Sequence, residues 1–209
     1  EALIEPELTN AYRFINGASD GWPGRYVDLL GEIVLSQSAQ ALSLSQREEL
    51  GRLAKVFSAR GAYHKILTRQ MGRTAQGETS PQLALGEAAP ERFTIRENGM
   101  QFELSVSEGY SVGLFLDQRD NRRRMLTRHV ASNFPLLPAA PEVGPWEMLN
   151  TFAYTCGFSV CAAKAGARTT SLDLSKRWLD WGKRNFLLNQ IDPAGHDFLY
   201  GEAFDWLRR

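Results

Sequence analysis

Two strand-like segments rich in apolar residues predict a β-hairpin near the start of the chain. Residues 25–30 and 33–37 have the pattern of two strands, and Gly31-Glu32 between them fits a tight connection. Glycines and a proline at residues 20–24 predict a turn before the first of these strands.

A helix is predicted after the hairpin. Ser45 and Glu48 match a capping box, and apolar residues recur at helical spacing from Leu50 to Phe57. We expect this helix to stop at Gly61.

Strand-like and polar segments alternate over the next stretch. Residues 63–67 predict a strand, and the polar, glycine-containing residues 70–86 predict an exposed loop. Further strands are expected at residues 93–96 and 100–106, on either side of the strong hairpin signal Asn98-Gly99. The first half of the chain therefore predicts a small α+β domain of the form strand–strand–helix–strand–strand.

The pattern changes after residue 108. Residues 113–116 are apolar, Asp117 is a candidate N-cap, and a helix is expected to follow it. Residues 133–145 contain four prolines, which oppose a helix or a central strand and predict a linker.

Strands and helices are predicted to alternate from Trp146 to the end of the chain, as they do in βαβ units with a parallel sheet. The predicted strands are residues 147–150, 169–174 and 196–200, and the predicted helices are about 158–166 and Lys176–Leu188. The fold class expected is α/β, with a domain at residues 1–108, a connecting segment at 109–145 and a second domain at 146–209.

The turn after the first of these strands, together with Asp173, predicts an adenosine-type ligand. An acid at the carboxyl end of the second strand of such a unit typically binds the ribose. Pyrophosphate needs a glycine-rich turn, whereas this turn has only Gly157 and contains the aromatic Phe152 and Tyr154. These residues favour S-adenosylmethionine over NAD. The alternative is a buried βαβ unit in which Asp173 only caps the next helix, although Ser175 is the better candidate for that cap.

Composition adds little to the prediction of function. Lys and Arg number 24 and balance 24 Asp and Glu, so the net charge does not indicate a nucleic-acid partner. Cys156 and Cys161 are expected to be buried thiols rather than a disulfide. The three histidines lack zinc-like spacing, and no metal site is expected. No apolar run is long enough to span a membrane and no signal peptide is visible, so we expect a cytoplasmic protein without a membrane partner.

One local basic cluster lies on the helix predicted after Asp117. Arg119, Arg122 and Arg123 are spaced to share one helical face, which could bind RNA phosphates. A solvated helix, with its arginines offset by Asp117 and Asp120, is the simpler interpretation.

Several longer stretches resemble the bacterial S-adenosylmethionine-dependent large-subunit (23S) rRNA methyltransferases of the cytosine-5 type. They are TNAYRFINGASDGWPGRYVDLLGE, GLFLDQRDNRRR, and LNTFAYTCGFSVCAAKAGA with SLDLSKRWLDWGKRN. The resemblance runs from Leu8 to Leu207. It implies a central α+β domain followed by the first half of a Rossmann-like class I methyltransferase sheet, with ribosomal RNA as the substrate and partner.

The resemblance also implies where the cofactor binds. The turn would wrap the methionine end, Asp173 would accept hydrogen bonds from the ribose hydroxyls, and Glu202 would lie beside the adenine. Arg119 and Arg122 are the connecting residues best suited to bind a carboxylate or a phosphate. The implied cofactor-binding residues are Phe115, Asp117, Gln118, Arg119, Asn150, Phe152, Ala153, Tyr154, Thr155, Gly157, Asp173, Leu174, Ser175, Glu202, Ala203 and Phe204, and the candidates for RNA contact are Arg122 and Arg123.

The chain departs from the family pattern in two places. Cys156 stands where the family usually has a second glycine, which predicts a wider or strained turn. The chain also stops at Arg209, before the family's Asp-Pro-Pro motif and catalytic cysteine. Methylation of cytosine C5 needs a thiolate that adds to C6, and neither Cys156 nor Cys161 is expected to supply it, so the catalytic residues stay unassigned.

An open apolar edge is expected on strand 147–150, and such an edge invites pairing with another strand. We expect a fragment of a longer enzyme, truncated at both ends, or self-association that covers this edge. Three functions stay open: an rRNA methyltransferase, a methyltransferase of a protein or a small molecule, and a truncated non-catalytic RNA-binding relative.

Overall fold

The computed structural model describes residues 4–67, 80–108, 111–136 and 145–208 of the chain. The chain divides into two compact units, residues 1–99 with 104–112 and residues 100–103 with 113–209. Each unit is described by itself.

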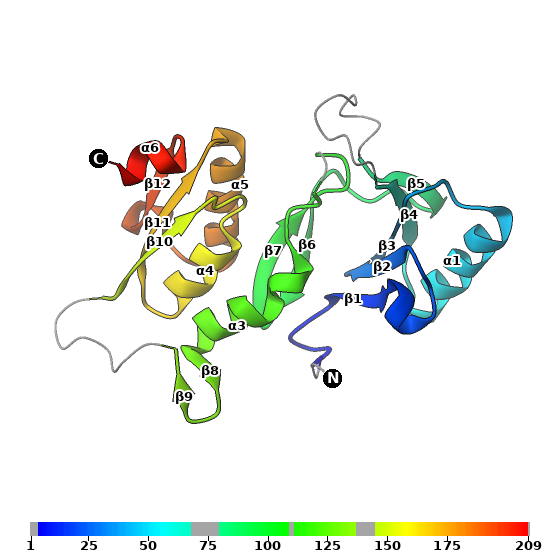
Figure 1. Ribbon diagram of the computed structural model, residues 1–209, viewed down its shortest axis with the longest axis horizontal. Helices are drawn as coiled ribbons and strands as arrows, with labels where there is room; N and C mark the ends of the chain where they lie inside the picture. The colour runs from blue at the N-terminus through cyan, green and yellow to red at the C-terminus, as the bar shows by residue number, and fades with distance from the viewer. Residues whose placement is uncertain (1–3, 68–79, 109–110, 137–144, 209) are drawn as a thin grey trace. The chain divides into compact units, whose positions relative to one another are not determined.

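The first unit is built on a five-stranded sheet with the order β1-β2-β3-β4-β5 (Figure 1). Only β3 and β4 pair in parallel, and α1 supplies the crossover that a parallel pair requires. The elements are β1 (Ala11–Asn16), β2 (Arg25–Leu30), β3 (Ile33–Ser38), α1 (Leu44–Val56), β4 (Gly61–Ile66) and β5 (Gln82–Gly86), with a 3₁₀ turn at Gly17–Asp20.

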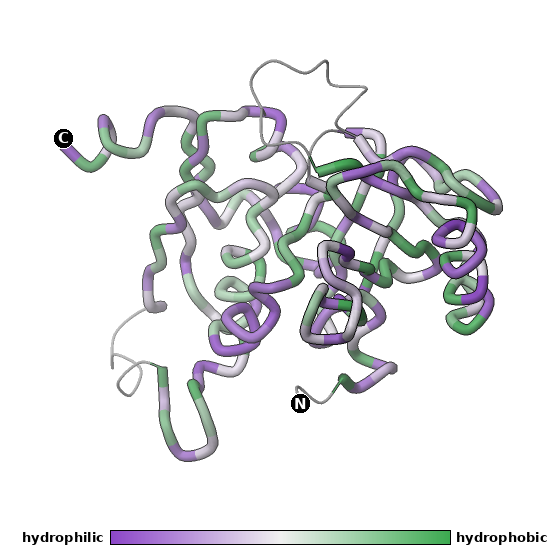
Figure 2. Tube along the Cα trace, turned by 45° about the vertical axis from the view of Figure 1, so that its right-hand side comes forward, coloured by the Kyte–Doolittle hydropathy of each residue, from purple (hydrophilic) through white to green (hydrophobic). Residues whose placement is uncertain are grey.

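Helix α1 packs its apolar side on the sheet and leaves its polar side to solvent. Leu50 is fully buried in a cluster with Val27, Leu29, Val34 and Ala62 from the strands. Hydrophobic and hydrophilic residues alternate around the helix (Figure 2), which is the pattern that predicted it.

The start of α1 corrects one prediction. The N-cap is Ser43, not Ser45: its side chain accepts from the Gln46 N–H, and the Gln46 side chain accepts from the Ser43 N–H. The capping box is therefore real but two residues earlier, because Gln46 replaces Glu48 as its third-position partner. The helix also ends at Val56, five residues before Gly61, which instead begins β4.

Two strands of the first unit were not predicted. β1 was missed entirely. β5 occupies the end of the segment predicted as a loop at residues 70–86, of which residues 70–79 lie outside the described residues. The predicted hairpin is confirmed: β6 (Phe93–Glu97) of the first unit and β7 (Met100–Leu104), of which residues 100–103 belong to the second unit, pair around Asn98-Gly99, both with positive φ.

The second unit contains a parallel sheet with the order β10-β11-β12. Helices α4 and α5 connect successive strands, contact each other, and lie on the same face of the sheet, as right-handed crossovers require (Figure 1). The elements are β10 (Glu147–Thr151), α4 (Gly157–Lys164), β11 (Arg168–Asp173), α5 (Lys176–Leu188), β12 (Asp197–Tyr200) and α6 (Ala203–Leu207), with a 3₁₀ turn at Pro193–Gly195. The predicted α/β fold class is confirmed.

Helix α3 (Arg119–Thr127) precedes the sheet and packs on α4. A 3₁₀ turn at Leu116–Gln118 leads into it, so its N-cap is Gln118 and not Asp117. The proline-rich segment is not wholly a linker, because β8 (His129–Ala131) pairs with β9 (Phe134–Pro135). Residues 137–144 of that segment lie outside the described residues.

Candidate functional site

The carboxyl ends of β10, β11 and β12 lie at one edge of the parallel sheet, where open α/β sheets bind ligands. The turn at residues 152–156 follows β10, Asp173 ends β11, and Glu202 lies just beyond β12. The Gly201 N–H donates to the Asp173 carbonyl over 3.0 Å. The fold therefore brings the predicted turn, acid and adenine-side residue to one edge.

The turn has an unusual backbone. Phe152, Tyr154 and Cys156 have φ angles of 57°, 48° and 61°. Non-glycine residues in this region cost of order 1–3 kcal/mol each and persist where their surroundings hold them. The strain predicted at Cys156 is present, and it extends to two further residues of the turn.

Asp173 holds this turn in place. Its Oδ2 accepts from the Tyr154 N–H over 2.8 Å, and its Oδ1 accepts from the Ser175 N–H over 2.9 Å. Ser175 is the N-cap of α5, as predicted, because its hydroxyl oxygen accepts from the Trp178 N–H. Asp173 therefore does not merely cap the helix: it ties the turn after β10 to the start of α5.

Cys156 packs directly against Gly182 of α5. A Cβ added to Gly182 would lie 2.8 Å from the Cys156 Cβ and would overlap its Sγ. Burial raises the pKa of the Cys156 thiol to about 12. Cys156 has no exposed surface and Cys161 is 2 % exposed, so neither cysteine is accessible from solvent.

A hollow opens beside the turn. Its walls come from the segment before α3, from α3 itself, from the end of β10, and from the turn with the start of α4. The lining residues are Leu114, Phe115, Gln118, Arg122, Asn150, Phe152, Ala153, Tyr154, Thr155, Gly157 and Phe158.

Arg122 is the cation of this hollow. It is 2 % exposed, its Nη2 donates to the Phe115 carbonyl over 2.7 Å, and its guanidinium lies 5.8 Å from the Phe158 ring centre. The expectation that Arg119, Arg122 and Arg123 share one exposed face is therefore not met. Arg122 lines the hollow instead of standing on an exposed face, and its predicted contact with RNA stays a prediction.

Most of the predicted cofactor residues surround the hollow or the strand ends. Eight of them line the hollow: Phe115, Gln118, Asn150, Phe152, Ala153, Tyr154, Thr155 and Gly157. Asp173, Leu174, Ser175, Glu202, Ala203 and Phe204 lie at the ends of β11 and β12 instead. Asp117 and Arg119 do not line the hollow, and the Asp117 carboxylate accepts from the Gln118 side chain. Leu114 and Phe158 were missed, and Arg122 was predicted to bind a carboxylate or a phosphate but was not among the implied cofactor-binding residues.

Apolar side chains flank the two acids at the strand ends. Phe152, Leu174 and Phe204 are 62 %, 60 % and 58 % exposed, and the rings of Phe152 and Phe204 lie 6.2 Å apart. The Glu202 side chain accepts from the Asp205 N–H and caps α6. Exposed apolar surface beside a carboxylate suits a ligand with a flat base and a ribose.

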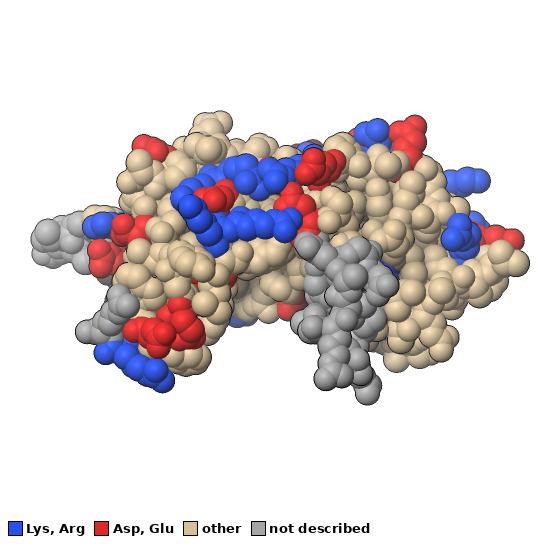
Figure 3. All heavy atoms as spheres, turned by 90° about the horizontal axis from the view of Figure 1, so that it is seen from above, with Lys and Arg blue, Asp and Glu red and all other residues tan. Residues whose placement is uncertain are grey.

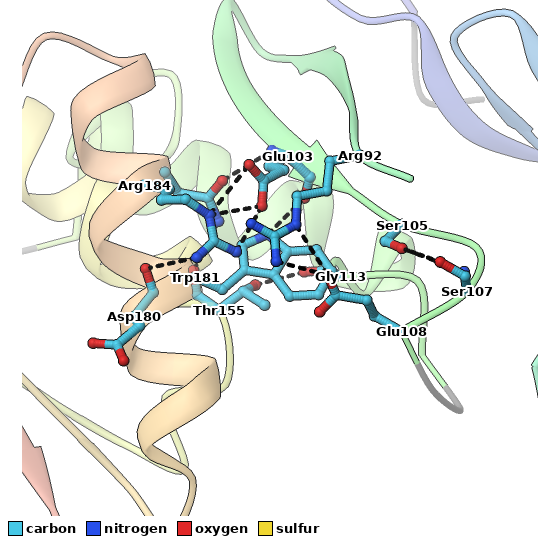
Figure 4. Close-up of polar contacts among 11 residues, drawn as sticks. Arg92, Glu103, Ser105, Ser107, Glu108, Gly113, Thr155, Asp180, Trp181 and Arg184 are labelled. Atoms are coloured by element: carbon cyan, nitrogen blue, oxygen red, sulfur yellow. Dashed lines mark hydrogen bonds and ion pairs between the residues drawn. The ribbon is translucent and has the colours of Figure 1, made fainter. Parts of the chain in front are cut away.

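Thr155 is fixed from two sides, and its contact with Gly113 is drawn in Figure 4. Its hydroxyl donates to the Gly113 carbonyl over 2.5 Å, and its own carbonyl accepts from the Asn185 side chain over 2.9 Å. Thr155 is 1 % exposed, so both bonds are shielded from water. Asn185 was not among the predicted site residues.

Two classes of site are not found in the part of the chain that the structure describes. No group of three or more His, Cys, Asp or Glu side chains is placed to hold a metal ion. No helix there has the length and apolar character needed to cross a membrane.

Comparison with known proteins gives the same picture. Residues 35–208 match the family model described as S-adenosylmethionine-dependent methyltransferase. A "Ribosomal RNA large subunit methyltransferase" of Deinococcus radiodurans is 33 % identical over 205 residues, which is 95 % of this chain and 46 % of that protein. The chain thus spans about half the length of the curated relatives it matches.

Comparison with solved structures indicates the same family as the sequence comparisons. One described as a SAM-dependent methyltransferase from Streptococcus mutans, and another of SMU.776, described as a methyltransferase complexed with SAH, each superpose with a TM-score of 0.76. Both are 30 % identical to this chain and cover 96 % of it and 48 % of their own chains. With the matched residues, the parallel sheet and the acid at the end of β11, these comparisons show that the chain belongs to the S-adenosylmethionine-dependent methyltransferase family.

Proposed function

We propose that the carboxyl edge of the β10–β12 sheet binds S-adenosylmethionine and serves a methyltransferase acting on large-subunit ribosomal RNA. The observation that carries the cofactor assignment is Asp173. Each of its carboxylate oxygens accepts one backbone N–H, which leaves further acceptor capacity for two ribose hydroxyls. A cofactor whose ribose binds there is next to the turn that Asp173 itself holds.

The other residues fit the remaining parts of the cofactor. The buried Arg122 guanidinium in the hollow suits the methionine carboxylate, with which it can form charge-assisted hydrogen bonds. Phe152, Leu174 and Phe204 suit the two faces and the edge of the adenine, and Glu202 suits its amino group. S-adenosylmethionine supplies an electrophilic methyl group on a sulfonium centre. The role of this chain's residues is to bind and orient it and to keep water from the hollow.

Ribosomal RNA as substrate, and cytosine C5 as the methylated atom, are proposed from the relatives and from the sequence resemblance. Lys and Arg side chains are interleaved with Asp and Glu on the face seen in Figure 3, so surface charge adds little to the argument. Arg123 pairs with Asp120 and Lys183 with Asp180, each three residues apart on its helix. Methylation at C5 would need a thiolate other than the buried Cys156 and Cys161.

The unpaired edge of β10 is a second place, besides the cofactor site, where we propose a partner. Within the described residues β10 pairs only with β11, and Leu149 on it is 51 % exposed. We propose that a second copy of the chain pairs with this edge when nothing else covers it.

The cofactor proposal is tested by calorimetric titration with S-adenosylhomocysteine. We expect saturable binding by the chain and loss of at least about tenfold in affinity in Asp173→Ala, since two charge-assisted hydrogen bonds are removed. Asp197→Ala is the matched control, because Asp197 lies at the other end of the sheet and pairs with Arg168. Absence of binding by the folded chain, or equal loss in both variants, would contradict the proposal.

The substrate is tested separately, by binding of the chain to large-subunit rRNA at low salt and again at high salt. We expect salt-sensitive binding, because phosphate contacts release counterions. No binding to rRNA by a chain that still binds S-adenosylhomocysteine would favour a protein or small-molecule substrate.

A further inference from the structure

A stripe of three side chains on α5 and its C-cap pairs with the backbone of β7. Trp181, Asn185 and Asn189 are four residues apart and therefore lie on one side of the helix. The Trp181 Nε1 donates to the Glu103 carbonyl over 3.1 Å (Figure 4). The Asn185 Oδ1 accepts from the Glu103 N–H over 2.9 Å. The stripe thus satisfies the backbone groups of Glu103 as a neighbouring strand would.

Asn189 repeats this pairing two residues earlier on β7. Its Oδ1 accepts from the Gln101 N–H over 2.9 Å, and its Nδ2 donates to the Gln101 carbonyl over 2.7 Å and to the Asn185 carbonyl over 2.8 Å. Glu103 also forms an ion pair with Arg184 over 2.8 Å. The pairing between α5 and β7 is therefore held at several points besides Asn185.

Asn185 differs from the rest of the stripe because it also reaches the turn. Its Nδ2 donates to the Thr155 carbonyl over 2.9 Å, and Asn185 has no exposed surface. One amide group therefore joins β7 on one side to the turn at residues 152–156 on the other. A hydrogen bond this deeply buried is costly to break, because the carbonyl left behind cannot pair with water.

We propose that Asn185 is a positioning residue for the cofactor. By fixing the Thr155 carbonyl it restrains the turn, whose three residues with positive φ need such a restraint. The inference rests on the proposed function, because the turn lines the hollow assigned to the cofactor's methionine end. Asn185 itself does not line that hollow.

The test compares two variants of equal shape change, Asn185→Asp and Asn189→Asp. Each replaces an amide donor that faces a backbone carbonyl with a carboxylate of the same size, and each keeps the acceptor for the β7 N–H. Only Asn185→Asp removes a hydrogen bond to the turn at residues 152–156. Two quantities are measured: hydrogen exchange of the amides at residues 152–156 without ligand, and the affinity for S-adenosylhomocysteine between pH 8 and pH 5.5.

For Asn185→Asp we expect faster exchange in the turn and affinity at pH 8 weakened about tenfold. Burial and the Thr155 carbonyl raise the pKa of the new carboxyl, so it regains a proton, and its donor, as the pH falls. Affinity should therefore recover toward pH 5.5 in this variant, while wild-type affinity stays flat. For Asn189→Asp we expect a similar loss of thermal stability with unchanged turn exchange and unchanged affinity.

Equal effects of the two variants on affinity, or no effect of Asn185→Asp, would overturn the inference. Should Asn185→Asp fail to fold at pH 8, Asn185→Ser and Asn189→Ser give the same comparison without the pH profile. Failure of the wild-type chain to bind S-adenosylhomocysteine would contradict the proposed function. In that case, faster hydrogen exchange of residues 152–156 in Asn185→Asp alone would still show that Asn185 restrains the turn. Unchanged exchange of these residues would contradict that restraint too.

Discussion

At the scale of single residues, the turn at residues 152–156 depends on the close packing of Cys156 against Gly182. Cys156 occupies the volume that any side chain at position 182 would need, and Gly182 is the residue that leaves it free. Cys156 also takes a positive φ that glycine would adopt without cost. The two positions therefore form one packing unit.

Substitution of Gly182 by Ala should displace Cys156 and with it the turn. We expect a loss of about 1–3 kcal/mol in the free energy of unfolding, as for other overpacked sites, and weaker binding of S-adenosylhomocysteine. Thermal melting and calorimetric titration measure the two effects.

Adding Cys156→Gly to Gly182→Ala should restore both properties, because it removes the overlapping atoms and the unfavourable φ. Gly195→Ala is the control, since a Cβ there meets nothing within 4 Å. A Gly182→Ala chain as stable as the wild type would show that the turn can shift without cost.

Sequence reasoning found the site residues that carry a local signal and missed those that do not. Asp173 stands at the end of a predicted strand, and the aromatic turn stands next to a glycine, so both are visible in the sequence. The packing of Arg122 against Phe158 and the reach of Asn185 to Thr155 join segments far apart in the chain. Charge pattern alone made Arg122 look like a surface residue.

At the scale of elements, two strand edges of the second unit differ. The β7 backbone at Gln101 and Glu103 is bonded by side chains of α5. The outer edge of β10 has no paired strand within the described residues. An unpaired strand edge such as that of β10 can pair with a strand of another chain.

A charge on β10 should therefore prevent self-association. We expect the chain to show concentration-dependent association in sedimentation velocity, and Leu149→Lys to abolish it, because a lysine on an edge strand opposes strand pairing. Leu187→Lys on α5 is the control, since Leu187 is 61 % exposed but lies on a helix. A wild-type chain that stays monomeric at all concentrations would contradict the proposal.

Elements with a strong periodic pattern were predicted closely. The bounds predicted for β2 and α5 are those observed, at Arg25–Leu30 and Lys176–Leu188. β5 was missed because residues 70–86 were interpreted as one polar loop, although Leu83, Ala84 and Leu85 near its end are apolar and lie on the strand that pairs with β4. The cap at Ser43 was misplaced because Ser45 offers the same motif two residues later, and only geometry distinguishes them.

At the scale of the whole molecule, the chain consists of two units, of which the second holds the proposed cofactor site. The bounds predicted for the domains, at residues 108 and 145, stay a prediction. A ligand that binds only folded protein stabilises the part to which it binds.

Calorimetric melting should therefore resolve the two units. We expect S-adenosylhomocysteine at about 100 times its Kd to stabilise one transition by about 2.7 kcal/mol and to leave the other unchanged. Asp173→Ala should remove this shift. A single transition that moves as a whole would show that the two units unfold together.

The pairing of β7 with α5 has a consequence for synthesis. Gln101 and its partner Asn189 are 88 positions apart, so β7 leaves the ribosome long before the residues that complete its hydrogen bonds exist. At about 5–20 residues per second, this interval is roughly 4–18 seconds. During that time the nascent chain presents a strand whose outer edge has no native partner, and this is the period in which a chaperone would protect it.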